Sequence, residues 1–220
     1  MKTHSKIYRK LFSLSIVALI VISIAFAYHL YFGKIAAFML INQMHHPIFD
    51  QFFKYYTNFG DGLVWLPVFL FSYFYAKNRV PLVITNFALS SLFAVILKKL
   101  VYAQALRPSV LIQQGYHLHL VEGVKIHTSN SFPSGHTITA FAIGFTMILL
   151  VKKNNYIKYL FLIMAFLVGY SRVYLAQHYP IDVICGACIG IFSTYLSVYL
   201  HSLIKSLLKK RKRNLSLELS

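Results

Sequence analysis

The chain carries two arginines, two histidines, a Ser-Gly turn and one carboxylate in an order that suits the chemistry of a phosphate ester. They occur in three segments: Arg107-Pro108, then Pro133-Ser134-Gly135-His136, then Ser171-Arg172 with His178 and Asp182 behind it. A phosphomonoester carries nearly two negative charges, and its cleavage depends mostly on positioning and electrostatic stabilisation. Because the guanidinium fork matches phosphate geometry and stays charged, we expect Arg107 and Arg172 to form a phosphate clamp.

The second segment has the composition of a helix start that binds an anion. Ser134 can cap the helix, and Gly135 allows the backbone to approach a ligand closely. The free N–H groups and the dipole of a helix N-terminus attract phosphate. Alone, this pattern is also typical of an ordinary N-cap before a membrane helix, but His136 directly after it and the third segment favour a site.

The third segment pairs a histidine with an acid at helical spacing. His178 and Asp182 are four residues apart, and Pro180 between them suits the first turn of a helix. A carboxylate that accepts one ring N–H fixes the tautomer and leaves the other nitrogen as a nucleophile. His136 then remains as the proton donor to the leaving oxygen.

Composition places these segments in a membrane protein. Of the 220 residues, 58% are hydrophobic and 12% charged, against about a quarter charged in soluble domains, which predicts one integral membrane domain over 1–220. The net charge of +17 does not indicate a nucleic-acid binder, because the basic residues cluster in connectors and at the two ends. The basic tail 205–220 is expected to contact anionic lipid, and Cys185 and Cys188 to pack inside an apolar run rather than form a redox or zinc pair.

Six apolar stretches approach the length of about 20 residues that spans a bilayer, so we expect an all-α bundle of six transmembrane helices. They are 11–32, 62–76, 81–101, 134–151, 156–174 and 180–204. The first resembles a signal sequence, with Ala25-Phe26-Ala27 as a possible cleavage site, but its length favours an uncleaved helix. The amphipathic stretch 47–56 is expected either to lie flat at the membrane interface or to pack across the bundle. Asp61, in a turn, is interpreted as a helix cap rather than a catalytic group.

Charge distribution predicts the orientation. Six spans place both termini on one side, and that side holds fifteen of the 22 Lys and Arg residues. The positive-inside rule then makes both termini cytoplasmic. The three segments lie on the opposite side, so we expect an extracytoplasmic active-site loop at the periplasmic face of a bacterial inner membrane.

The three segments together resemble the signature of the type 2 phosphatidic acid phosphatase family, which also includes vanadium haloperoxidases. That signature is a lysine, six residues and Arg-Pro; then Pro-Ser-Gly-His; then Ser-Arg, five residues, His, three residues and Asp. The second and third parts match residue for residue, within a core from about Lys98 to Asp182. The resemblance implies that His178 forms a phosphohistidine, Asp182 orients it and His136 is the general acid. It also implies that phosphate is bound by a lysine together with Arg107, Ser134, Gly135 and Arg172, and that neither a metal nor a cofactor is needed.

The first part of the signature departs from the pattern. In the family, six residues separate the lysine from Arg-Pro, and in this chain that position holds Leu100. Lys99 is separated from Arg107 by seven residues and Lys98 by eight. One residue is about 100° around an α-helix, so a bulge is needed to restore the reach of a lysine, and Lys99 is our choice. The loop that holds His117, His119, Glu122 and His127 is expected to face lipid headgroups and not to bind a metal.

These observations favour an enzyme that hydrolyses a lipid phosphate or diphosphate in the outer leaflet. Undecaprenyl diphosphate and lipid A fit best, while phosphatidylglycerol phosphate and phosphatidic acid are compatible. A phosphotransferase that passes the phosphate to a second lipid is the alternative. A non-catalytic lipid-binding protein would not need the His178–Asp182 pair, and nothing beyond the shared pocket indicates a haloperoxidase. The oligomeric state stays open.

Overall fold

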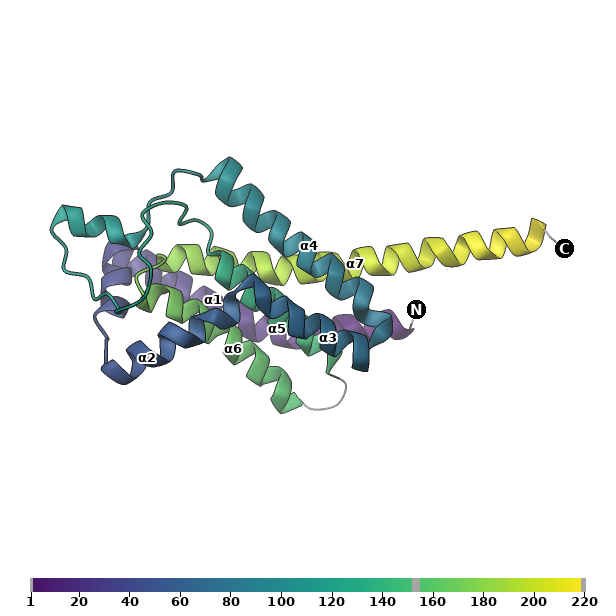
Figure 1. Cartoon of the computed structure of the whole chain (residues 1–220). Coiled ribbons are helices and arrows are strands. Elements are labelled where there is room, and N and C mark those ends of the chain that lie inside the picture. The colour runs from purple at the N-terminus through teal and green to yellow at the C-terminus, as the bar shows by residue number, and fades with distance from the viewer. Residues whose placement is uncertain (1, 152–154, 219–220) are drawn as a thin grey trace.

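A computed structural model describes residues 2–151 and 155–218, and that part of the chain is helical with no strand (Figure 1). In the described residues, seven α-helices are connected by short helical turns and by loops. The helices are α1 (Lys2–Asn42), α2 (Pro47–Tyr56), α3 (Trp65–Tyr75), α4 (Val80–Ile96), α5 (Gly135–Leu150), α6 (Asn155–Tyr174) and α7 (Pro180–Glu218). The turns are η1 (Thr57–Gly60), η2 (Gly62–Val64), η3 (Lys77–Arg79), η4 (Leu97–Val101) and η5 (Pro108–Gln114). The all-α prediction is confirmed.

Four helical stretches in the described residues are long and apolar enough to cross a membrane: Leu11–Asn42, Lys77–Val101, Tyr156–Tyr174 and Pro180–Arg211. Two further apolar helices are shorter, Gly62–Tyr75 and Gly135–Leu150. The chain therefore has the helices of a membrane protein, while the count of six spans stays a prediction. Both termini lie at one end of the bundle, and the long connection between α4 and α5 lies at the other (Figure 1).

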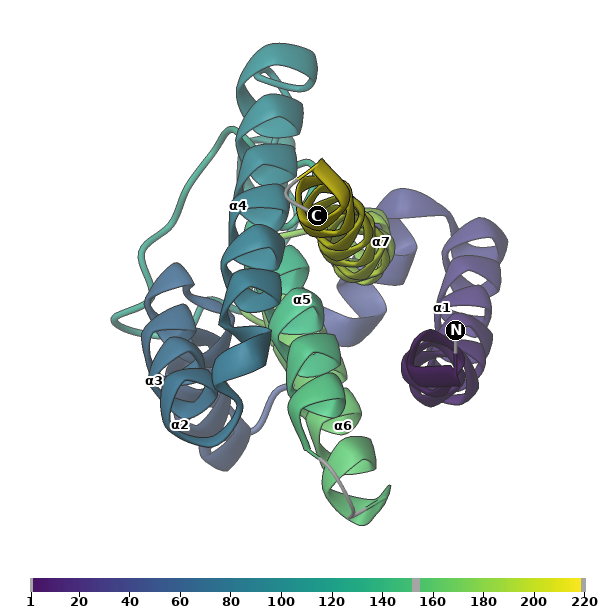
Figure 2. The same cartoon turned by 90° about the vertical axis from the view of Figure 1, so that its right-hand side faces the viewer.

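Helix α5 is the centre of the bundle, with α3, α4, α6 and α7 around it and α1 on the outer side of α7 (Figure 2). Its contact with α7 depends on Gly190, because a Cβ there would lie 2.6 Å from the carbonyl oxygen of Ile138. Small residues that let helix backbones approach are typical of membrane bundles. Buried Asn86 of α4 adds polar contacts, donating to Thr146 Oγ1 at 2.8 Å and to Thr194 Oγ1 at 3.0 Å.

Several predicted element ends coincide with the structure. The first apolar run ends where α1 breaks at Gly33, whose φ of 75° suits glycine. Helix α2 has the predicted bounds and packs on α6, with the Phe53 ring 4.8 Å from that of Tyr174. Asp61 Oδ1 accepts a hydrogen bond from Leu63 N at 2.8 Å, so it is a cap as predicted. The position of α2 relative to a membrane interface stays a prediction.

The last helix is longer than the bundle. Helix α7 begins at Pro180, as the proline predicted, and its C-terminal half projects past the other helices (Figure 1). Cys185 and Cys188 lie in its first turns as free thiols. Among the described residues, no group of three or more His, Cys, Asp or Glu side chains is arranged to hold a metal ion.

Candidate active site

The three segments meet at the end of the bundle where the α4–α5 connection lies. The N–H of Ser134 donates to the carbonyl of Asp182 at 3.0 Å, which joins the start of α5 to the start of α7. The N–H of His178 donates to the carbonyl of Arg172 at 3.0 Å, which closes the turn between α6 and α7. Arg107 Nη1 donates to the Gln177 carbonyl at 3.2 Å and to Gln177 Oε1 at 3.0 Å. Residues distant in sequence thus surround one small region.

His178 and Asp182 face each other in the interior, with 1% and 3% of their surface exposed. His178 Nδ1 lies 3.4 Å from Asp182 Oδ2 and makes no hydrogen bond within the described residues. The same carboxylate oxygen accepts from Ser131 Oγ at 2.5 Å and from the N–H of Tyr179 at 3.0 Å. The carboxylate of Asp182 thus faces the ring nitrogen of His178 that it would orient in a histidine–carboxylate pair.

The environment keeps His178 neutral. Burial lowers the pKa of the imidazole well below its usual range, and the positive charges of Arg172, Arg107 and Lys98 lower it further. A neutral imidazole has a free ring nitrogen, which is the form that can attack phosphorus.

The guanidinium groups of Arg107 and Arg172 are both buried, and the phosphate clamp expected of them stays a prediction. Arg107 Nε donates to the carbonyl of Ser129 at 2.9 Å, and Arg172 Nη1 donates to Thr57 Oγ1 at 2.7 Å. Arg172 Nε is buried without a hydrogen-bond partner in the part of the chain described. Burial lowers the pKa of Arg107, but from so high a value that the group stays charged. An unpaired guanidinium donor beside a second guanidinium is the arrangement that a phosphate oxygen would satisfy.

Ser134, Gly135 and His136 form the N-terminus of α5. Ser134 Oγ is fully buried and accepts from Thr137 Oγ1 at 2.8 Å and from the Thr137 N–H at 3.4 Å, so the predicted N-cap is present. Accepting these two bonds leaves the hydroxyl proton of Ser134 as a donor, so the phosphate contact expected of Ser134 stays a prediction. Gly60 of η1 packs directly on His136, because a Cβ at Gly60 would lie 2.9 Å from that of His136.

A comparison with protein-family models identifies the family of this chain. The family model described as "PAP2 superfamily" matches residues 62–205, a range that includes all three segments. The chain belongs to the PAP2 superfamily. The resemblance to type 2 phosphatidic acid phosphatases is therefore confirmed.

Relatives within the PAP2 superfamily include lipid phosphatases. The chain is 32% identical to the undecaprenyl-diphosphatase of Sulfolobus acidocaldarius over 77% of its own length and 79% of that protein. It is 29% identical to the lipid A 4'-phosphatase of Bacteroides thetaiotaomicron over 74% of each chain. The crystal structure of Aquifex aeolicus LpxE superposes with a TM-score of 0.66 and 32% identity, covering 76% of this chain and 94% of that one.

The lysine of the PAP2 signature is the one position where the structure differs from our choice. Lys99 is exposed, whereas Lys98 Nζ donates to the carbonyl of Asn130 at 3.3 Å and would lie 3.7 Å from a Cβ at Gly135. The reason is η4, a π-helical turn in which the N–H of Tyr102 donates to the carbonyl of Leu97. A π-turn accommodates an extra residue within a helix and often occurs at functional sites. The predicted bulge is therefore present, but it directs Lys98 to the site.

Three site residues of this PAP2 chain were missed by sequence reasoning. Ser131 binds Asp182, Gln177 binds Arg107, and Thr57 binds Arg172. Only Gln177 had a local signal, its position directly before His178. The other two come from segments that the motifs do not include.

The histidines of the 117–127 loop differ in their surroundings, and the expected contact of this loop with lipid headgroups stays a prediction. The side chains of His117, Glu122 and His127 are exposed. Partial desolvation of the His127 ring and the nearby positive charges of Arg107 and Lys125 lower its pKa. His119 instead faces inward and bonds to Asp50, with Nε2 3.0 Å from the carboxylate oxygens.

Proposed function

We propose that this protein removes phosphate from a membrane lipid phosphate or diphosphate, through a phosphohistidine formed on His178. The observation that carries the proposal is the buried His178–Asp182 pair beside Arg107 and Arg172. A lipid-binding protein needs the cations but not a neutral imidazole oriented by a carboxylate. Similarity to an undecaprenyl-diphosphatase and to a lipid A 4'-phosphatase supports these two lipids as the favoured substrates.

Each side chain has a role in the proposed reaction. A lone pair of His178 Nε2 attacks phosphorus while the bond from phosphorus to the leaving oxygen breaks. His136, which takes up a proton when the negatively charged phosphate group occupies the site, gives that proton to the leaving oxygen. Asp182 stabilises the imidazolium-like charge that develops as the N–P bond forms. Water then attacks the phosphohistidine, gives a proton to His136 and releases inorganic phosphate and free His178.

The cations stabilise the transferred group. Charge spreads over the three equatorial oxygens in the transition state, and fixed donors around them act without reorganising. Arg107, Arg172 and Lys98 supply these donors together with the N-terminus of α5 at Gly135. Lys98 takes the part that the sequence assigned to Lys99.

The membrane arrangement belongs to the same proposal. The short helices Gly62–Tyr75 and Gly135–Leu150 complete six spans, because a span that ends within protein can be shorter than the bilayer core. The positive-inside rule makes both termini cytoplasmic and the site periplasmic. Helix α2 lies at the interface while it packs on α6, since its outer side exposes Ile48, Phe49, Phe52 and Tyr55.

Phosphate release by detergent-purified protein tests the proposal. The assay uses undecaprenyl diphosphate, lipid A, phosphatidylglycerol phosphate and phosphatidic acid, with EDTA present throughout and His178→Ala in parallel. We expect release from one of the first two lipids, unchanged by EDTA and absent in the variant. Release that requires added metal, or that persists in His178→Ala, contradicts the mechanism. Release only after a second lipid is added identifies a phosphotransferase instead.

A further inference from the structure

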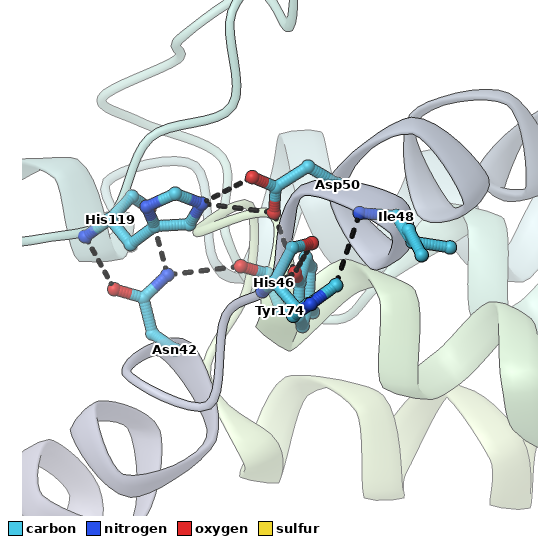
Figure 3. Close-up of polar contacts among 6 residues, drawn as sticks. All are labelled: Asn42, His46, Ile48, Asp50, His119 and Tyr174. Carbon is cyan, nitrogen blue, oxygen red and sulfur yellow. Dashed lines mark hydrogen bonds and ion pairs between the residues drawn. The ribbon is translucent and has the colours of Figure 1, made fainter.

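Figure 3 shows a second polar cluster, which contains none of the residues that the PAP2 signature specifies. It joins the end of α1, the start of α2, the loop before the site and the last turn of α6. We call it the polar clasp, and define it as Asn42, His46, Asp50, His119 and Tyr174.

Asn42 holds the loop to the end of α6. Its side chain is fully buried, and Nδ2 donates to the carbonyls of His119 and Tyr174, both at 2.9 Å. Oδ1 accepts from the N–H of His119 at 2.9 Å. One amide therefore satisfies three backbone groups on two segments that are far apart in sequence (Figure 3).

Tyr174 connects the same helix end to α2. Its hydroxyl donates to Asp50 Oδ1 at 2.5 Å and accepts from the N–H of His46 at 3.2 Å. Asp50 also bonds to His119. Burial alone would raise the pKa of the Asp50 carboxyl, but the hydrogen bonds from Tyr174 and His119 outweigh it and hold the pKa below its usual range. The carboxylate therefore stays charged and binds both partners at neutral pH.

The clasp bonds to the last turn of α6, directly after Arg172. Tyr174 is two residues beyond Arg172, and the carbonyl of Arg172 accepts from the N–H groups of Gln177 and His178 at 2.9 and 3.0 Å. A shift of the last turn of α6 would therefore move the guanidinium and the imidazole together. The loop that His119 anchors continues to Ser131, which binds Asp182.

A contrast within the chain separates positioning from simple stabilisation. Asn86 is as deeply buried as Asn42 and also makes several hydrogen bonds, but it joins α4 to α5 and α7 in the middle of the bundle. Tyr28 also uses its hydroxyl to hold a helix, donating to the carbonyl of Ala37 at 3.1 Å across the break in α1. The bonds of Asn86 reach α5 and α7 at Ala142, Thr146 and Thr194, away from the helix ends beside Arg172 and His178. The bond of Tyr28 stays within α1.

We propose that Tyr174, Asp50 and Asn42 are positioning residues, which hold the last turn of α6 so that Arg172 and His178 meet the same phosphate. The proposal rests on the proposed function. It assigns to α2 and to the histidine loop a role in the reaction that the signature motifs do not include. The residues do not touch the substrate, so they are expected to act through the geometry of the clamp.

The test compares Tyr174→Phe with the matched control Tyr28→Phe. Each variant loses one hydroxyl and keeps its ring, and Tyr174→Phe retains the packing against Phe53. We expect Tyr174→Phe to lower kcat and to weaken vanadate inhibition, each by about tenfold, since small misplacements of catalytic groups have large effects on rate. Tyr28→Phe is expected to change neither by more than about twofold. Asp50→Asn should fall between wild type and Tyr174→Phe, because the amide keeps an acceptor for the hydroxyl.

Thermal unfolding in detergent accompanies the kinetics. Asn86→Ala is expected to lower Tm without a matching loss of kcat, whereas Asn42→Ala should lower both. Equal kinetic constants for Tyr174→Phe and Tyr28→Phe overturn the proposal, as does a loss of kcat in Asn86→Ala as large as in Asn42→Ala.

A readout without turnover separates this inference from the proposed function. Vanadate mimics phosphate and should raise the Tm of the wild-type protein by binding the clamp. If no lipid is hydrolysed but vanadate raises Tm in wild type and not in Tyr174→Phe, the proposed substrates are wrong and the clasp is supported. A vanadate-induced rise that is unchanged in Tyr174→Phe refutes the clasp whatever the substrate.

Discussion

The tight contact between η1 and α5 makes Gly60 a sensitive position for catalysis. A Cβ at Gly60 would lie 2.8 Å from the carbonyl oxygen of His136 and 2.7 Å from Val168 Cγ1. Both contacts are closer than real Cβ atoms tolerate, and one of them is backbone. Gly60→Ala must therefore push η1 and the first turn of α5 apart, and His136 is the residue at that contact.

The cost can be estimated from packing energetics. Inserting one methyl group into a well-packed interior typically costs about 1–3 kcal/mol. The protein can relieve the clash by moving His136. If transition-state stabilisation then falls by this same energy, kcat falls by roughly fivefold to 150-fold, because about 1.4 kcal/mol corresponds to tenfold in rate. If η1 moves instead, Thr57 shifts with it and Arg172 loses the hydroxyl that its Nη1 donates to.

Gly62→Ala is the matched control, since a Cβ at Gly62 meets nothing within 4 Å. Steady-state kinetics on the best lipid substrate and on p-nitrophenyl phosphate should distinguish the two routes. Loss of the proton donor matters less for nitrophenolate, a good leaving group, so movement of His136 predicts a smaller loss on that substrate. Movement of Arg172 predicts that kcat falls by the same factor on the lipid and on p-nitrophenyl phosphate. If Gly60→Ala matches Gly62→Ala in kcat and in Tm, the packing argument is refuted.

Two further predictions concern the nucleophile and its carboxylate. Burial depresses the pKa of His178, so its ring should stay neutral as the pH falls through about 6.5, the ordinary histidine value, and protonate only at more acid pH. An NMR titration of the ring resonance, assigned by its loss in His178→Gln, measures this. A midpoint near pH 6.5 would contradict the claim that burial lowers the pKa of His178. Ser131→Ala removes the 2.5 Å hydrogen bond to Asp182. It should lower kcat about tenfold or more, since hydrogen bonds to charged groups contribute roughly 1.5–3 kcal/mol. An unchanged kcat with a normal Tm would show that Asp182 does not need the hydrogen bond from Ser131.

Local rules predicted the helix ends around the site. Ser134 caps α5, Pro180 opens α7 and Asp61 caps η2, because each depends only on the residue and its next three or four neighbours. The bounds of α2 followed from Pro47 and from amphipathic spacing for the same reason.

Tertiary contacts were beyond the reach of such rules. Which lysine faces the site depends on whether η4, the turn that contains both lysines, is π-helical or α-helical. The bond from the N–H of Tyr102 to the carbonyl of Leu97 belongs to the π-helical form. The polar clasp joins Asn42 to Tyr174 across 132 positions. Asn42 lies in no recognisable motif, and Tyr174 is one of the five unspecified residues between Arg172 and His178. The tight approach of Gly60 to His136 is likewise invisible until η1 and α5 are placed together.

The charges of the site explain why so much structure surrounds it. Arg107 and Arg172 are both buried, and among the described residues neither forms an ion pair with an acid. Two guanidinium groups in a poorly solvated space repel each other, so the site opposes folding until an anion enters it. A phosphate group supplies the missing charge, and its binding energy adds to the stability of the folded state. The hydrogen bonds of the two guanidinium groups go to neutral acceptors, which include Thr57, Gln177 and the carbonyl of Ser129. An acid at any of these positions would stabilise the free protein but would compete with phosphate for the same donors.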